Sequence, residues 1–290
     1  MGKFKEQRYL PYLFLLPTLL VLLWITIFPF GYILYLSVHR YYLLRPWVPR
    51  IFLGVKNFVE LFTDEMFKNT IVVTVSFTLI SVALEFLVGL GLALIFTLNV
   101  KAERLIISLL IAPMVVAPVA AGLLWGSMYN AEFGIISYFL DRLFGVTGIS
   151  LLGDVKTAFP SCVIVDVWQW SPFMFIILLA GLKSLPNAPF EAARIDGAST
   201  LQLFRYITLP ILKPIILVVL LIRTIDAFKT FDTLYVLTGG GPASTTETLS
   251  LYAYRVNFTY FNMGYGAVLA LVLLIIIIGF CVMFNKLVSR

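Results

Sequence analysis

Charged residues are scarce in this 290-residue sequence. Asp, Glu, Lys and Arg together make up 12% of the chain, and apolar residues make up 61%. An ordinary soluble domain has about 25% charged and about 45–50% apolar residues. This composition excludes a typical water-soluble fold and predicts a membrane protein. The net charge of +6 comes from scattered Lys and Arg rather than from one basic stripe, so we expect no nucleic-acid partner.

Cysteine and histidine are almost absent. Cys162 and Cys281 both fall within apolar runs, where they are expected to pack as small hydrophobic residues and form no disulfide framework. His39 is the sole histidine and has no evident partners for a metal site or a catalytic triad. Gly239–Gly241 is not followed by the Gly-Lys-Ser/Thr of a nucleotide-binding loop. We therefore expect no metal, no cofactor and no enzymatic activity in this chain.

Long apolar runs are the dominant feature of the sequence. About twenty apolar residues span a bilayer, and unpaired backbone groups are not tolerated in hydrocarbon, so such runs should be helices. The sequence predicts an all-α polytopic membrane protein that forms a single transmembrane domain over residues 1–290. Six spans are expected, at about residues 10–38, 69–99, 105–129, 159–182, 209–237 and 263–285. Pro113 and Pro118 predict a bend within the third span.

A charged loop, residues 183–208, separates the fourth and fifth expected spans. Pro189 suits a first helical turn, so a short helix should begin near Asn187 and end before Gly197. Ser199 and Gln202 have the spacing of a capping box, which predicts a second short helix there. Any water-exposed loop of a membrane protein can carry a charged helix, so these signals alone do not give the loop a function.

The loop sequence resembles the EAA loop of permease subunits from binding-protein-dependent ABC importers. The matching residues are Glu191-Ala192-Ala193, Asp196-Gly197-Ala198, Phe204 and Ile207-Thr208-Leu209-Pro210. A second segment, Phe231-Asp232 followed by Leu237-Thr238-Gly239-Gly240-Gly241-Pro242 and Thr246, is similar to the carbohydrate-uptake branch, the maltose-type and glycerol-phosphate-type permeases. The family-like features cover roughly residues 10–290.

This resemblance implies a set of partners. It implies a second homologous permease, two cytoplasmic ATPase subunits that bind ATP and Mg, an external solute-binding protein and a sugar-like solute. The loop would dock on an ATPase, with Glu191 meeting a basic residue there. The residues that inherit this coupling role are Glu191, Ala192, Ala193, Asp196, Gly197 and Phe204. The resemblance also implies a bacterial or archaeal cytoplasmic membrane, with the loop and both chain termini on the cytoplasmic side.

Ionisable residues inside membrane spans are candidates for solute contact, because burying each costs roughly 2.5 to 3.5 kcal/mol at mid-helix. Helical spacing places polar and aromatic residues on one face of the fourth span and on one face of the fifth. We predict a substrate site formed by Asp166, Trp170, Phe173, Arg223, Asp226 and Thr230. Alternatively, Arg223 and Asp226 form only a packing salt bridge. Glu85, the charge in the second span, is expected to be a packing partner rather than part of a pathway.

Two functions fit these features. The first is an ABC importer permease that moves a sugar, oligosaccharide or polyol by alternating access. The second is an ion- or proton-coupled secondary transporter in which Asp166, Asp226 and Glu85 form a relay, although the inverted repeats typical of that class are not evident. The sequence leaves the solute open, and Arg223 would permit an anionic sugar.

Overall fold

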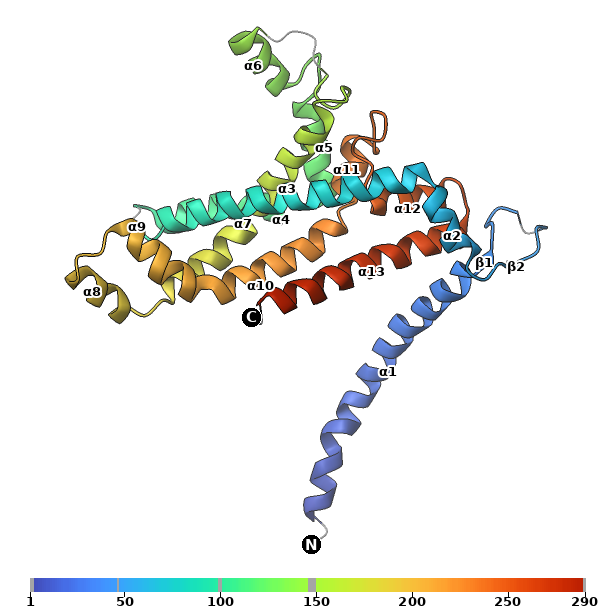
Figure 1. The fold of residues 1–290 in the computed structure, drawn as a ribbon, viewed down its shortest axis with the longest axis horizontal. Helices are drawn as coiled ribbons and strands as arrows, with labels where there is room; N and C mark the ends of the chain where they lie inside the picture. Colours follow the sequence, from blue (N-terminus) through green and yellow to red (C-terminus); the bar gives the residue numbers. More distant parts are fainter. Residues whose placement is uncertain (1–2, 46, 99–100, 146–149, 289–290) are drawn as a thin grey trace. The chain divides into compact units, whose positions relative to one another are not determined.

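The computed structural model describes residues 3–45, 47–98, 101–145 and 150–288, and these are largely helical (Figure 1). Contacts between residues divide the chain into two compact units. Unit 1 comprises Met1–Glu65 and Ala253–Leu274, and unit 2 comprises Met66–Tyr252 and Ile275–Arg290. Each unit is described by itself.

Unit 1 is built on helix α1 (Lys3–Ser37), a two-stranded hairpin and a short helix. Strands β1 (His39–Arg40) and β2 (Ile51–Phe52) pair antiparallel, with His39 opposite Phe52. Helix α2 (Lys56–Thr63) follows. The unit also contains the end of α12 (Leu249–Phe258) and the start of α13 (Met263–Val288). An isolated bridge between Tyr42 and Asn262 joins the hairpin to the segment before α13.

Unit 2 contains the remaining helices, of which three long ones form the main core. These are α3 (Glu65–Ile95), α7 (Ala158–Lys183) and α10 (Leu209–Phe228). The shorter helices are α4 (Glu103–Val115), α5 (Pro118–Met128), α6 (Ile135–Phe144), α8 (Ala188–Ile195), α9 (Thr200–Leu203), a π-helical turn η1 (Phe204–Thr208) and α11 (Asp232–Leu237).

The core between α3, α7 and α10 is apolar and closely packed. Phe96 and Phe175 meet edge to face, and Leu178, Leu212 and Val219 are fully buried around them. Gly89 of α3 lies against Met174 and the Phe175 backbone, so close that an added Cβ would be 2.5 Å from the Met174 Cβ. Small residues at helix contacts allow membrane helices to pack closely, because association in lipid depends on packing rather than on the hydrophobic effect.

Five helices among the described residues are long and apolar enough to cross a membrane. They are Tyr12–Ser37, Glu65–Ile95, Ala158–Lys183, Thr200–Phe228 and Met263–Lys286. A sixth span is possible if α4 and α5 together count as one broken helix, since they meet at a 96° bend. Pro118 begins α5 and Pro113 lies near the end of α4, as expected from the missing amide hydrogens of proline. The predicted all-α membrane class and the bend within 105–129 are confirmed.

The apolar run 209–237 is not one helix, contrary to the expected fifth span. The helix ends at Phe228, and α11 begins afresh at Asp232. At its other end the helix continues back through η1 and α9 to Thr200. The π turn explains the continuity: the Leu209 amide bonds to the Phe204 carbonyl, which accommodates the amide that Pro210 lacks. The span is therefore shifted toward the charged loop.

Candidate functional site

The charged loop between α7 and α10 (residues 183–208), which we name the coupling loop after its predicted role, is built from strong local signals. Asn187 precedes α8, and Pro189 lies in its first turn. Gly197 adopts φ +80°, a left-handed conformation that favours glycine. The Gly197 amide bonds to the Arg194 carbonyl (3.1 Å) and the Ala198 amide to the Ala193 carbonyl (2.9 Å), which is a Schellman motif. The predicted first helix and its break at Gly197 are confirmed.

The second helix of the coupling loop begins with the predicted capping box. The Ser199 amide donates to Gln202 Oε1 (2.7 Å), and the Gln202 amide donates to Ser199 Oγ (3.3 Å). From Thr200 the helix continues without interruption to Phe228. The tip of the loop is therefore the first turn of a membrane-spanning helix.

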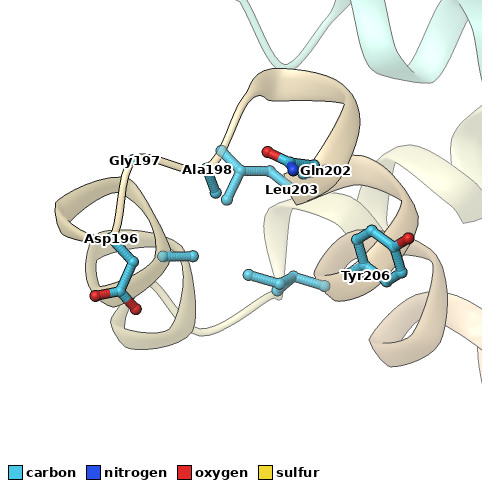
Figure 2. Close-up of a pocket in the computed structure, with 8 residues that line it drawn as sticks. Asp196, Gly197, Ala198, Gln202, Leu203 and Tyr206 are labelled. Atoms are coloured by element: carbon cyan, nitrogen blue, oxygen red, sulfur yellow. The ribbon is translucent and has the colours of Figure 1, made fainter.

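Two cavities lie around the coupling loop. The first has a volume of about 320 Å³, and Figure 2 shows Ala198 and Leu203 between Asp196 and Tyr206 along it. The second, about 1030 Å³, lies between α8, α9 and the ends of α3 and α7, and its lining includes Glu191, Arg194 and Phe204. Glu191 and Asp196 are exposed, while Phe204 is half-buried. Exposed charges beside hollowed apolar surface are typical of a protein-docking site.

A buried charge cluster, formed by Glu85, Asp166 and Arg223, joins the three core helices. Arg223 Nε donates to Glu85 Oε2 (2.8 Å), and Arg223 Nη2 donates to both Glu85 Oε1 (2.9 Å) and Asp166 Oδ2 (2.6 Å). The exposed fractions are 0% for Glu85, 2% for Asp166 and 1% for Arg223. Charges buried this deeply are tolerated only when they are paired and hydrogen-bonded, and the two-point contact between guanidinium and carboxylate satisfies that requirement.

Two further residues lie at the edge of the charge cluster. The Arg223 guanidinium lies over the Trp170 ring, 5.1 Å from its centroid, in a cation–π arrangement. Asp226 Oδ2 lies 3.6 Å from Arg223 Nη1, and its other oxygen lies 3.6 Å from Lys229 Nζ. The Asp226 side chain is 47% exposed, so it links the buried cluster to accessible surface.

The structure thus brings four of the six predicted substrate residues together and leaves two apart. Asp166, Trp170, Arg223 and Asp226 are neighbours. Phe173 packs instead against the apolar core. Thr230 lies beyond the end of α10, and its carbonyl accepts a hydrogen bond from Thr248 Oγ1 (3.3 Å), so it does not share a helix face with Arg223.

Sequence reasoning missed the main partner of Arg223. It paired Arg223 with Asp226, whereas the short hydrogen bonds go to Glu85 and Asp166. The sequence contained a signal for this pairing, because Glu85 is a lone carboxylate in an apolar span and such a group must find a partner. Gln169 shares the polar face of the fourth span with Asp166 in sequence, but the structure gives it a structural partner. Its Nε2 donates to the Val116 carbonyl (2.9 Å), a group freed by the bend between α4 and α5.

The family comparison identifies what kind of protein has this architecture. Residues 7–286 match the family described as binding-protein-dependent transport system inner membrane component. The chain belongs to this family. The predicted family is therefore confirmed, and the chain is a multi-pass inner-membrane permease subunit of an ABC importer rather than an enzyme.

Individual relatives align over nearly their whole length with this permease. This permease is 38% identical to the trehalose/maltose transport system permease protein MalF of Thermococcus litoralis, over 98% of this chain and 95% of the relative. It is 32% identical to the sn-glycerol-3-phosphate transport system permease protein UgpA of Pectobacterium atrosepticum, over 98% and 96% of the two chains.

A solved structure shares the fold of this permease. It is a bacterial ABC transporter involved in the import of the acidic polysaccharide alginate, with a TM-score of 0.85 over 99% of this chain and 98% of the other. The sequence identity is 22%, so this likeness concerns the fold alone.

Proposed function

We propose that this permease moves a sugar, an oligosaccharide or a related polyol across the cytoplasmic membrane by alternating access. The relatives that support this substrate class are named for trehalose/maltose and for sn-glycerol-3-phosphate transport. Each of these solutes carries more than one hydroxyl group. Carboxylates and an aromatic face, as in Asp226 and Trp170, suit such solutes, because carboxylates accept hydroxyl hydrogen bonds and the ring covers the apolar side of a sugar.

The observation that carries the mechanism is the continuous helix from Thr200 to Phe228. It begins in the coupling loop and contains Arg223, the centre of the buried charge cluster. A displacement of the loop would therefore be transmitted along this helix to Arg223 and its partners. The π turn is the one irregular segment between them. In this proposal Glu191, Ala192, Ala193, Asp196, Gly197 and Phe204 form the surface that a separate ATPase subunit moves.

The proposed assembly contains a second homologous permease, two cytoplasmic ATPase subunits and an external solute-binding protein. ATP and Mg would bind to the ATPase subunits and not to this chain. The coupling loop and both termini would lie on the cytoplasmic side. ATP-driven approach of the ATPases would draw the coupling loops together and open the solute cavity outward.

Within the predicted substrate site, we assign different roles to buried and accessible residues. Asp226 and the half-buried Trp170 are the candidates for direct solute contact. We assign no solute contact to Phe173, which packs against the apolar core, or to Thr230, which lies beyond the end of α10. Asp166 and Arg223 are occupied by short hydrogen bonds and would position Trp170 and Asp226.

The proposal is tested with Glu191→Lys and Gly197→Asp in the reconstituted complex. We expect each variant to insert normally but to lose most solute-stimulated ATP hydrolysis, because one reverses the docking charge and the other strains the φ +80° position. Glu132→Lys, an exposed position outside the loop, serves as the matched control and should retain activity. Normal stimulation in both loop variants, or uptake driven by a proton gradient without ATP, would refute the proposal.

A further inference from the structure

Helix α2 is held at both ends by the ends of two membrane spans. Asn57 Nδ2 donates to the carbonyls of Ser37 (2.8 Å) and His39 (3.1 Å), and Ser37 is the last residue of α1. At the other end of α2, Tyr265 in the first turn of α13 donates from its hydroxyl to Asp64 Oδ2 (2.5 Å). The eight-residue helix, about 12 Å long, therefore lies at the level where α1 ends and α13 begins.

The hairpin that precedes α2 is fixed at the same level. The Leu43 amide donates to the Phe261 carbonyl (3.0 Å), and the Gly264 amide donates to the Tyr41 carbonyl (3.3 Å). A Cβ at Gly264 would clash with the His39 carbonyl oxygen, so the start of α13 packs directly on the hairpin backbone. These contacts hold the hairpin and α2 beside the end of α1 and the start of α13.

Helix α2 presents three distinct faces. Asn57 and Leu61 are buried. An exposed polar face follows, with Lys56, Glu60 and Thr63. The third face is apolar and exposed, with exposed fractions of 69% for Val55, 56% for Val59 and 77% for Phe62. The spacing i, i+4, i+7 aligns these three side chains in one stripe. A narrow apolar stripe beside a polar one is the pattern of a helix that lies in a membrane interface.

The hairpin continues this surface with aromatic and cationic residues. Trp47 and Phe52 are exposed. Arg45 lies over the Tyr42 ring (5.5 Å) and Arg50 over the Tyr41 ring (4.4 Å). Aromatic side chains concentrate at membrane–water interfaces, and a guanidinium matches a phosphate through two parallel hydrogen bonds. Both arginines are exposed and therefore accessible to headgroups.

We propose that α2 and the preceding hairpin form an interfacial anchor whose ligand is the phospholipid surface. The Val55, Val59 and Phe62 stripe lies in the upper acyl region, and Arg45 and Arg50 lie among the headgroup phosphates. Lipid is the occupant because the two helices that hold the anchor, α1 and α13, are themselves membrane spans that end there. The anchor fixes the depth of these two spans. This role is independent of the solute and of ATP coupling.

The test measures lipid contact at single positions of α2. Cysteines are introduced at Val59 and Phe62, with Glu60→Cys and Thr63→Cys on the polar face as matched controls, in a Cys281→Ser background because Cys162 is buried. Each variant of the full complex is labelled with a small fluorophore and placed in nanodiscs that contain brominated phosphatidylglycerol. We expect quenching at Val59 and Phe62 to exceed that at Glu60 and Thr63 severalfold, because the apolar face of an interfacial helix is buried about 5–10 Å into the headgroup and acyl boundary.

Equal quenching at the four positions would overturn the proposal. It would also be overturned if bromolipid fails to quench the labels at Val59 and Phe62 in the full complex, because the second permease would then cover the stripe. Loss of their quenching on addition of the solute-binding protein would overturn it for the same reason. In the Arg45→Gln, Arg50→Gln double variant, quenching at Val59 should fall in phosphatidylglycerol and not in phosphatidylcholine. Unchanged quenching in both lipids would refute the phosphate contacts.

Discussion

At the scale of single residues, Arg223 is the point on which the core of unit 2 depends. It joins Glu85 of α3 and Asp166 of α7 to α10, with all three side chains almost fully buried. Because neither carboxylate reaches water, each depends on the guanidinium for its charge balance. Loss of the arginine would leave two uncompensated buried acids.

We therefore expect Arg223→Met to destabilise the permease by about 3–5 kcal/mol, the usual result when one partner of a buried ion pair is removed. The matched control is Lys229→Met in the cap of the same helix. Lys229 is exposed and pairs with Asp226 at 3.6 Å, so its loss should change stability by about 0–1 kcal/mol. Thermal unfolding of the detergent-solubilised complex distinguishes the two. Equal midpoints would show that the charge cluster does not stabilise the fold.

At the scale of secondary-structure elements, the coupling loop depends on its caps. The Schellman motif at Gly197 ends α8, and the capping box at Ser199 begins the helix that reaches Arg223. Both devices satisfy backbone groups that a helix end leaves unpaired. The loop conformation is thus specified by a few side chains with little burial.

The capping box can be tested alone. Ser199→Ala should destabilise the first turn of the helix by about 1 kcal/mol, because the Gln202 amide loses its acceptor. Hydrogen exchange of the amides in Thr200–Leu203 should then accelerate by about fivefold. Ser199→Thr keeps the hydroxyl and should exchange like the wild type. Identical exchange in the alanine and threonine variants would contradict this role.

At the scale of the whole molecule, the remaining question is which side of the membrane each loop faces. Family membership establishes a multi-pass inner-membrane permease. The proposed ATPase partner requires the coupling loop to lie in the cytoplasm. Segments separated from it by one span, including the loop after α5, would then face the outside.

Accessibility labelling tests this orientation. In a Cys281→Ser background, Arg194→Cys in the coupling loop should react with a membrane-impermeant maleimide only after the cells are lysed. Glu132→Cys, which follows α5, should react in cells whose cytoplasmic membrane is intact and whose outer envelope has been permeabilised. Both positions are exposed, so reactivity reports sidedness rather than burial. The reverse pattern would exclude contact between the loop and a cytoplasmic ATPase.

Much of the fold could be predicted because its signals are local. The apolar runs gave the spans, Pro113 and Pro118 gave the bend, and Ser199 with Gln202 gave a helix start, since each depends on residues that are neighbours in the chain. The fifth span was misplaced at both ends. The helix extends back past Pro210 because a π turn accommodates the proline, and it stops at Phe228 although the apolar run continues.

The sequence by itself determined the membrane class, the family and the capped coupling loop, because apolar length and capping pairs act over a few residues. Only the tertiary structure decided the partners of Arg223, which lie 138 and 57 residues away, and the bond from Gln169 to the broken helix. The spacing of neighbouring residues cannot predict contacts between residues so far apart in the chain. A buried charge takes whichever opposite charges the packing of α3, α7 and α10 brings to it, and that packing is a property of the folded chain.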